Sequence, residues 1–503
     1  MRLTALATNK SFVRFALFFG LLIAASALLA GCGQQVQAPA ATPKPLPSAA
    51  TVATGAGEKS AVVEQQHPTP SAADVHASAS VPEATLTPAP GSSEADANTA
   101  QGPSPIPTAD PAAVIHAGEN QASGQQGWSP LFTELQGCQE KDVVFGVSPI
   151  DIDYIAAVEP QGELTGFYTG HITPGDHVGF QYDPAGPPRN VYALADGYLK
   201  RVERQPSPQG FGITADVKNY HLYFEYSCSL FGSYVHVTEL DPAVATADPE
   251  LQELDSGPHP DDTTSLYPNI PVKAGQLIGQ AEAFGLLGML TVDTAVTLSG
   301  FVTPSRYSGE PWKIHSVPPF DYFAEPLRKQ LLSKNPRTIE PIGGKIDFDV
   351  AGTLAGNWFL DGANYSGNAE RGWCGDYYCS YWNTHLAFVY DFVDQNQVRV
   401  SIGYDSGLYP QGPYGVKGNS PDPTTVSVDS GLVTLELVDL ENRDAEVGIT
   451  TFGKPLVTRG TDNVVGVMLV QMLDDRSVKM EIIPGANAAQ ELGFSEAATV
   501  YQR

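Results

Sequence analysis

The stretch Tyr220-His221-Leu222-Tyr223-Phe224, followed by Tyr234-Val235-His236-Val237, decides the fold class. Both runs are short and rich in aromatic and β-branched residues, and Gly232 lies between them. Short apolar runs bounded by turn-forming residues are typical of β-strands. We therefore predict an all-β region around them.

Similar runs extend this region in both directions. They lie at residues 143–147, 191–194, 276–278 and 292–298. Pro326 then opens one predicted helix, Leu327–Leu332, which ends before Asn335-Pro336 because proline disfavours helical continuation. The first folded region is expected to cover residues 127–336.

A second β pattern starts after Pro341-Ile342-Gly343-Gly344 and is expected to cover residues 343–485. Its first run, Ile346-Asp347-Phe348-Asp349-Val350, alternates between apolar and polar residues, as a half-buried strand does. Turns are expected at Asp361-Gly362 and Asp474-Asp475. The other predicted strands lie at residues 386–393, 398–402, 432–438, 464–472 and 478–483. We predict a sandwich or barrel, followed by a tail at residues 486–503.

The first 31 residues are predicted to be a secretory signal peptide. Arg2, Lys10 and Arg14 form a charged start, and the apolar run 15–29 is too short for a comfortable membrane span. The run ends in Leu29-Ala30-Gly31-Cys32, which resembles the lipobox of bacterial lipoproteins. This resemblance implies a lipid on Cys32 and an extracytoplasmic, lipid-anchored protein of the cell membrane. The alternative is an ordinary signal peptide with an incidental cysteine.

Residues 32–126 are predicted to be a disordered linker. They consist mainly of Ala, Pro, Ser and Thr with almost no large apolar residue, so they cannot bury enough surface to offset chain entropy. The formal charge of the 503-residue chain is -28, which disfavours nucleic acid and anionic lipid as partners.

Four cysteines remain once Cys32 is set aside, an even number in a compartment where disulfides persist. We expect Cys138 to pair with Cys228. Cys374 is expected to pair with Cys379, because Gly375-Asp376 allows a tight loop between them.

Several segments of the first β region occur in a familiar order. His177-Val178-Gly179-Phe180-Gln181 precedes Val191-Tyr192-Ala193-Leu194-Ala195-Asp196-Gly197-Tyr198-Leu199. Tyr234-Val235-His236-Val237 and Val272-Lys273-Ala274-Gly275-Gln276-Leu277-Ile278-Gly279 follow. Together they resemble the H-x-G-x-D, V-Y-A-x-x-D-G-x-V, Y-x-H-L and V-K-x-G-Q-x-I-G segments of the lysostaphin-type (LytM-like) zinc endopeptidases, which cut peptide bridges of peptidoglycan. The resemblance covers about residues 163 to 300 and implies that family's β fold.

The family's zinc is held by the His and Asp of the first segment and by the second His of a late H-x-H, and the open position carries an activated water. By this resemblance His177 stands at the first ligand and His236 at an assisting histidine. Gln181 stands where the ligand Asp belongs, and Val292-Asp293-Thr294-Ala295-Val296 contains no histidine where H-x-H is expected. The resemblance therefore implies the fold more strongly than the activity.

Three interpretations of this region stay open. A rearranged zinc site could use His171, Asp176 and His177, with Asp293 as a further acidic side chain. The histidines could instead serve only loop hydrogen bonding and strand packing. The favoured interpretation is a groove without metal, in which polar side chains bind a peptide or glycan. Its lining is predicted to be His177, Gln181, His236 and Asp293.

An aromatic cluster surrounds the second cysteine pair. Its members are Trp373, Tyr377, Tyr378, Tyr381 and Trp382. Aromatic faces stack on sugars and on protein partners, so the cluster is a candidate binding loop, with core packing as the alternative.

The sequence thus predicts a lipid-anchored envelope protein whose peptidase-like domain is non-catalytic and binds peptidoglycan or a wall-associated protein. A zinc-dependent peptidoglycan endopeptidase with an altered ligand set is the second hypothesis. A glycan- or small-molecule-binding lipoprotein is the third. No cofactor is expected under the first hypothesis, and zinc is expected only under the second.

Overall fold

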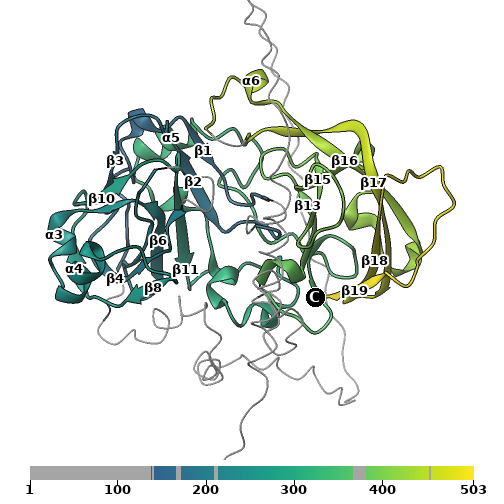
Figure 1. The fold of residues 1–503 in the computed structure, drawn as a ribbon, viewed down its shortest axis with the longest axis horizontal. Coiled ribbons are helices and arrows are strands. Elements are labelled where there is room, and N and C mark those ends of the chain that lie inside the picture. Colours follow the sequence, from purple (N-terminus) through teal and green to yellow (C-terminus); the bar gives the residue numbers. More distant parts are fainter. Residues whose placement is uncertain are drawn as a thin grey trace, which may run out of the picture. The chain divides into compact units, whose positions relative to one another are not determined.

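The computed structural model describes residues 138, 141–165, 171–208, 213, 215–365, 381–452 and 455–503. All of them belong to one compact unit, Pro103–Arg503. Strands dominate these residues, so the prediction of an all-β fold is confirmed. They form two regions along the chain, drawn in blue to teal and in green to yellow (Figure 1).

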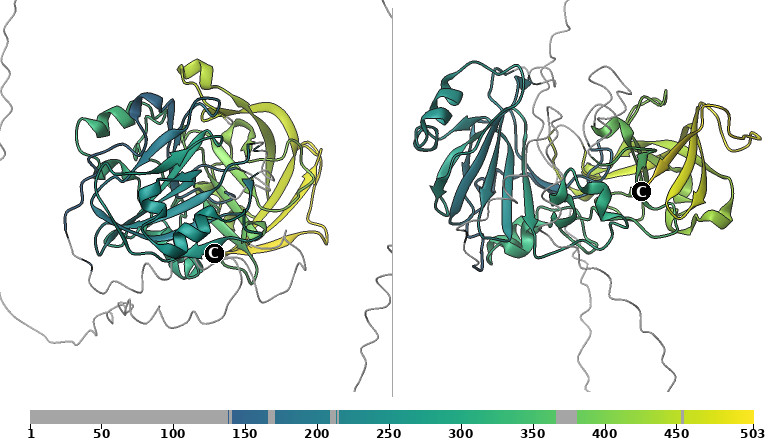
Figure 2. Two further views of the ribbon diagram at one scale, coloured as in Figure 1. Left: turned by 60° about the vertical axis from the view of Figure 1, so that its left-hand side comes forward. Right: turned by 90° about the horizontal axis from the view of Figure 1, so that it is seen from below.

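The first region is built on a large antiparallel sheet with the strand order β1-β2-β11-β6-β5-β4-β8 (Figures 1 and 2). A further strand, β9, pairs with β4. The strands are β1 (Ala157–Glu159), β2 (His177–Gln181), β4 (Gly197–Arg204), β5 (Tyr220–Glu225), β6 (Leu230–Val237), β8 (Thr264–Leu266), β9 (Ile270–Val272) and β11 (Leu286–Asp293).

A smaller sheet of β3, β10 and β7 accompanies the large one. Its strands are β3 (Arg189–Tyr192), β7 (Glu239–Leu240) and β10 (Leu277–Ala281). Helices α3 (Pro242–Ala245) and α4 (Pro249–Ser256) follow β7 and lie next to each other (Figure 1). Asp248 caps α4, because its carboxylate accepts the backbone N–H groups of Glu250 and Leu251.

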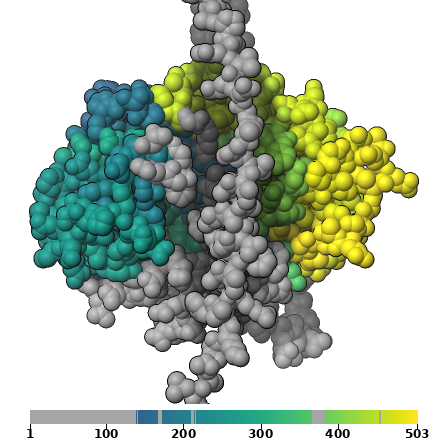
Figure 3. Space-filling model, viewed as in Figure 1, coloured from purple at the N-terminus to yellow at the C-terminus, as the bar shows by residue number. Residues whose placement is uncertain are grey.

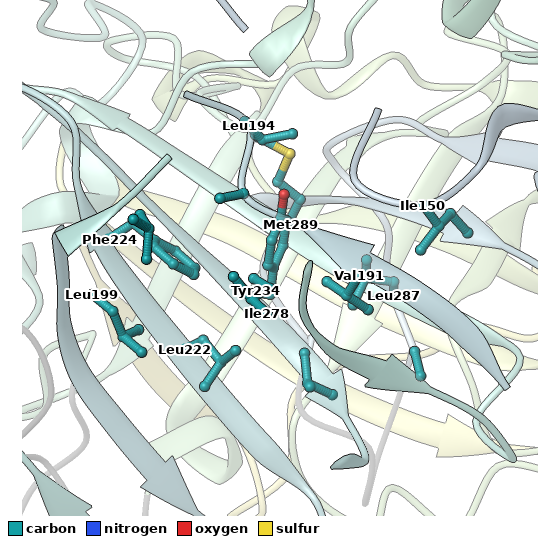
Figure 4. Close-up of a cluster of buried hydrophobic side chains, with 14 of the residues drawn as sticks. Ile150, Val191, Leu194, Leu199, Leu222, Phe224, Tyr234, Ile278, Leu287 and Met289 are labelled. Carbon is teal, nitrogen blue, oxygen red and sulfur yellow. The ribbon is translucent and has the colours of Figure 1, made fainter. Parts of the chain in front are cut away.

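The core of this region is formed by apolar side chains from both sheets. Leu222, Phe224 and Tyr234 of the large sheet lie in one cluster with Val191 and Ile278 of the small sheet (Figure 4). Their side chains occupy alternate positions along each strand, which leaves the intervening residues for the opposite face.

The second region is a closed barrel of strands β12 to β19 (Figures 1 and 2). The strands are β12 (Gly356–Leu360), β13 (His385–Tyr390), β14 (Val398–Ile402), β15 (Tyr414–Val416), β16 (Val433–Asn442), β17 (Thr458–Asp474), β18 (Ser477–Pro484) and β19 (Thr499–Gln502). Val398, Val400 and Ile402 of β14 belong to the barrel core. The last strands, drawn in yellow, form part of the visible surface (Figure 3).

Short helices connect these elements. Helix α5 (Leu327–Leu332) has the predicted bounds. The others are η2 (Ile152–Tyr154), η4 (Pro304–Tyr307), η5 (Pro311–His315), η6 (Pro319–Tyr322), η8 (Tyr381–Thr384), η9 (Lys417–Asn419), η10 (Pro423–Thr425), η11 (Val428–Ser430) and α6 (Asp444–Val447). Among the described residues, no helix is both long enough and apolar enough to cross a bilayer.

Three predicted strands are wrong. Residues 143–147 contribute only an isolated bridge from Phe145 to Phe323, and 346–350 are not a strand. In the predicted strand 292–298, β11 ends at Asp293, whose carboxylate accepts the N–H of Ala295 and turns the chain. The predicted tail 486–503 is also wrong, because it contains β19, which pairs with β12 and β18 and closes the barrel.

Candidate functional site

The outer face of the large sheet carries most of the residues that the sequence singled out. His177, Gly179 and Gln181 share this face of β2, whereas Val178 and Phe180 between them are in the core. On the neighbouring strand β11 the positions opposite these three are Leu290, Gly288 and Leu286.

Gly288 allows side chains of β2 and β6 to approach across β11. A Cβ at this position would collide with Val235 of β6 and would lie 3.2 Å from Cδ2 of His177. The missing side chain therefore leaves room for both neighbours on the outer face. A larger residue would separate them or displace the imidazole.

A β-bulge places His236 on the same face. The ladder between β5 and β6 shifts register between Tyr220 and Leu222, so that His221 lies opposite two residues, Val235 and His236. His236 has a φ of 69°, in the left-handed region that a bulge residue can adopt. Regular alternation would have directed this imidazole into the core.

His236 is partly buried and rests on an aromatic ring. Its imidazole stacks on Phe284 with ring centroids 4.3 Å apart and lies 6.2 Å from the ring of His221. Burial, together with the neighbouring His221 and His177, lowers the pKa of His236 to about 3. The imidazole is therefore neutral at pH 7 and can donate one hydrogen bond and accept another.

A loop before β2 adds a second imidazole pair. The ring of His171 lies 4.8 Å from that of His177, and the backbone of His171 forms two hydrogen bonds with Thr165. Burial is the largest cause that lowers the pKa of His171 to about 3. We call His171, His177, His221 and His236 the histidine face.

Asp176 connects this pair to a buried lysine. Its carboxylate lies 3.6 Å from Nδ1 of His177 and 3.8 Å from Nζ of Lys313, which is 1% exposed. Lys313 also donates a 2.7 Å hydrogen bond to the carbonyl of Pro174. Burial alone would raise the pKa of Asp176, but the Lys313 charge and the neighbouring His177 hold it well below its usual range. The Asp176 carboxylate is thus ionised, and the positive charge of Lys313 balances its negative charge.

Glu203 of β4 plays the corresponding part at the other end of the histidine face. It forms an ion pair with Arg201, accepts a 2.7 Å hydrogen bond from the Tyr223 hydroxyl, and lies 3.4 Å from Nδ1 of His221. Burial alone would raise the pKa of Glu203, but these partners, His221 first, bring it below its usual value. Both carboxylates beside the face therefore have their own partners.

The zinc site of the lysostaphin-type family does not fit these residues. Gln181 stands where the ligand Asp belongs and is 2% exposed. Its side-chain oxygen accepts the backbone N–H of Phe452 in the second β region, so this side chain forms a contact with that region. Leu286 and Leu290, opposite Gln181 and His177 on β11, have no ligand atom. In the part of the chain that the structure describes, no three His, Cys, Asp or Glu side chains are placed to hold a metal ion.

Asp293 does not join the other predicted groove residues. It ends β11 three residues beyond Leu290, and alternation puts it on the opposite face of the sheet. Its carboxylate accepts a 2.6 Å hydrogen bond from the Tyr322 hydroxyl. The structure therefore brings together His171, Asp176, His177 and His236, with Gln181 on the same face of β2 but engaged by the barrel.

The predicted disulfide between Cys138 and Cys228 is confirmed. Tyr381 and Trp382 lie in η8, where only the backbone is described. The other predictions on lipidation, the second disulfide and the aromatic loop lie outside the described residues: Cys32, Trp373, Cys374, Tyr377, Tyr378 and Cys379.

Sequence reasoning missed His221, Glu203 and Lys313. A signal for His221 was present, because it alternates with the apolar Tyr220 and Leu222 and so had to face away from the core. No comparable signal marked Lys313, which comes from a helical turn more than 130 residues after its partner Pro174.

No protein-family model matches this chain, and none of the curated proteins matches it.

Proposed function

We propose that this protein is a lipid-anchored cell-envelope protein whose first β region binds peptidoglycan, or a wall-associated protein, without hydrolysing it. The anchor is proposed from the lipobox-like end of the signal sequence at Cys32. The binding role is proposed from the histidine face. The one observation on which it depends is a polar, partly exposed sheet face that lacks a set of metal ligands among the described residues.

The chemistry of the histidine face suits an uncharged or weakly charged polar ligand. His171 and His236 are neutral at pH 7, and a neutral imidazole has one donor and one acceptor. Nδ1 of His236 lies 3.4 Å from Oδ1 of Asn219, so Nε2 is the ring nitrogen that is left for a ligand. Amide and hydroxyl groups of a peptide or glycan strand provide the complementary acceptors and donors. Phe284, stacked against His236, adds an apolar surface on which a sugar ring or alkyl chain can pack.

Among the described residues, the lack of a fitting set of zinc ligands argues against zinc-dependent hydrolysis. A catalytic zinc needs three protein ligands and an open position for water. His177 alone remains in register, since Gln181 is engaged by the barrel and the opposing residues are leucines. We therefore expect binding without cleavage.

Co-sedimentation with purified sacculi tests this proposal. The full chain is expected to pellet with sacculi without releasing soluble muropeptides. His236→Asn keeps a residue that tolerates positive φ but removes the ring, and is expected to weaken binding about tenfold, or about 1.4 kcal/mol. The matched control is His259→Gln, which changes a partly exposed histidine beside Asp216, outside the histidine face.

Metal analysis of the same protein distinguishes binding without cleavage from the second hypothesis, a zinc-dependent endopeptidase. We expect far less than one zinc per chain after purification without chelator. One zinc per chain, lost in His177→Ala and accompanied by muropeptide release, would establish the peptidase instead. Equal pelleting of wild type and His236→Asn would remove the histidine face as the binding surface.

A further inference from the structure

Two imidazoles of the histidine face lie beside carboxylates through the same ring nitrogen. Nδ1 of His177 lies 3.6 Å from Oδ1 of Asp176, and Nδ1 of His221 lies 3.4 Å from Oε2 of Glu203. The lone pairs of a carboxylate oxygen repel the lone pair of an unprotonated ring nitrogen, so each carboxylate favours the neutral tautomer with the proton on Nδ1. Nε2, on the far side of each ring, is then a hydrogen-bond acceptor.

A third imidazole follows the same pattern with an amide. Nδ1 of His236 lies 3.4 Å from Oδ1 of Asn219, an oxygen that can only accept. Asn219 is 8% exposed, and its backbone carbonyl accepts the N–H of Gln205, which fixes the position of this residue directly before β5. Since His236 remains neutral at pH 7, its Nε2 is also an acceptor.

The three acceptors are spread across the outer face of the large sheet. In the strand order β2-β11-β6-β5 their strands span three spacings, or about 14 Å. A Cβ at Gly288 would lie 3.7 Å from Nε2 of His177, so this nitrogen lies above β11, between β2 and β6. The side chains of His177 and His221 are 22% and 24% exposed. An extended ligand with several donor groups fits this spread better than a single small ion does.

We propose that the histidine face binds the glycan strand of peptidoglycan, whose hydroxyl and acetamide N–H groups donate to Nε2 of His177, His221 and His236. This inference rests on the proposed function and names the part of the wall polymer that is recognised. Phe284, whose ring centroid lies 4.3 Å from that of His236, provides an aromatic surface for the C–H face of a sugar. The carboxylates of the peptide stems would instead face the lone pairs of Nε2, which is unfavourable.

Nitrogen-15 NMR of the full chain labelled on histidine tests the tautomers without any ligand. At pH 8 the three rings are expected to have a protonated Nδ1 and an unprotonated Nε2. Their signals are assigned by their loss in His177→Gln, His221→Gln and His236→Asn. A proton on Nε2 of any of these rings would overturn the proposed acceptor surface.

Calorimetric titration of the full chain with tetra-N-acetylchitotetraose tests the ligand class, with the dipeptide L-alanyl-D-glutamate as the carboxylate-bearing probe. The sugar oligomer is expected to bind at least tenfold more tightly than the dipeptide. No oligomer binding at millimolar concentration, or dipeptide binding within tenfold of it, would overturn the glycan assignment. A chain that still pellets with sacculi in that case keeps the proposed wall binding through peptide or protein, whereas failure to pellet removes the proposed function itself.

Variants of Asn219 test its role as a positioning residue. Asn219→Leu removes the oxygen beside Nδ1 of His236, which should shift this ring towards the tautomer protonated on Nε2 and weaken oligomer binding about fivefold or more. Asn219→Asp keeps the oxygen and should restore both the tautomer and the binding at pH 8. Asn190→Leu, which removes an amide of β3 bonded to Gln280, is the matched control outside the histidine face. Unchanged oligomer binding in Asn219→Leu with a native near-UV circular dichroism spectrum would overturn the assignment of His236 to the glycan site.

Discussion

At the residue scale, His385 of the barrel should make the stability of the protein depend on pH. This imidazole is 1% exposed, stacks on Tyr365, and has Nε2 2.7 Å from the Tyr365 carbonyl. Burial lowers the pKa of His385 to about 3, below the 6.5 of an unfolded chain. Between these values the unfolded state binds the proton and the folded state does not, so stability falls as the pH falls from 6.5 towards 3.

His385→Gln keeps a donor for the Tyr365 carbonyl but does not titrate. Between pH 7 and pH 5, wild type is expected to lose about 2 kcal/mol more unfolding free energy than this variant. Urea denaturation at the two pH values measures the difference. His315→Gln, at a partly exposed histidine of η5, is the control substitution. If the unfolding free energies of wild type and His385→Gln change equally between the two pH values, His385 does not contribute to the pH dependence of stability.

The same scale explains why the candidate site was only partly predictable. The sequence identified His177 and His236, but regular alternation would have buried His236 beside Tyr234. The outcome depends on one inserted residue in β6, and a bulge of this kind leaves no periodic signal. Likewise, the hydrogen bond from Phe452 to Gln181 joins residues 271 positions apart, a distance at which local pattern carries no information.

At the element scale, an alternating or continuous apolar pattern predicted a strand correctly where the segment pairs with a neighbouring strand through backbone hydrogen bonds. Val398–Ile402 has the same bounds as β14. Residues 346–350 have an equally clear pattern but no ladder, because their carboxylates take the hydrogen bonds. Asp347 accepts the N–H of Gly300, and Asp349 accepts those of Val302 and Asn357. Aspartate side chains that bond to backbone compete with strand pairing in this way.

The disulfide also acts at the element scale. It joins Cys138, which precedes β1, to Cys228 in the turn between β5 and β6, across 90 residues. Closing a loop of this length restricts the unfolded chain, which stabilises the folded state by about 2–4 kcal/mol. The double variant Cys138→Ser and Cys228→Ser should lose this amount in urea denaturation. Reducing agent should destabilise wild type more than the double variant, which keeps only the cysteines outside this bond; equal stability of both proteins without reducing agent would contradict the prediction.

At the scale of the whole molecule, the two β regions share hydrophobic clusters and hydrogen bonds. Ala157 of β1 packs in one cluster with Phe392, Val393 and Leu456 of the second region. Arg337 is 2% exposed and donates 2.7 Å hydrogen bonds to the carbonyls of Pro341 and Phe392. Contacts of this kind couple the unfolding of the two regions, because neither can unfold without exposing the surface of the other.

We therefore expect wild type to unfold in one calorimetric transition, with calorimetric and van't Hoff enthalpies in agreement. Arg337→Ala leaves two buried carbonyls without their charged donor, which should lower the unfolding free energy by about 2–4 kcal/mol. It should also broaden or split the transition, since the first region and the barrel are then less tightly coupled. Arg328→Ala removes an arginine of α5 that is 40% exposed and paired with Asp321, and should change stability by less than about 0.5 kcal/mol. Two separate transitions in wild type would show that the two regions do not form one cooperative unit. A single sharp transition of Arg337→Ala at the wild-type temperature would show that the buried guanidinium does not couple them.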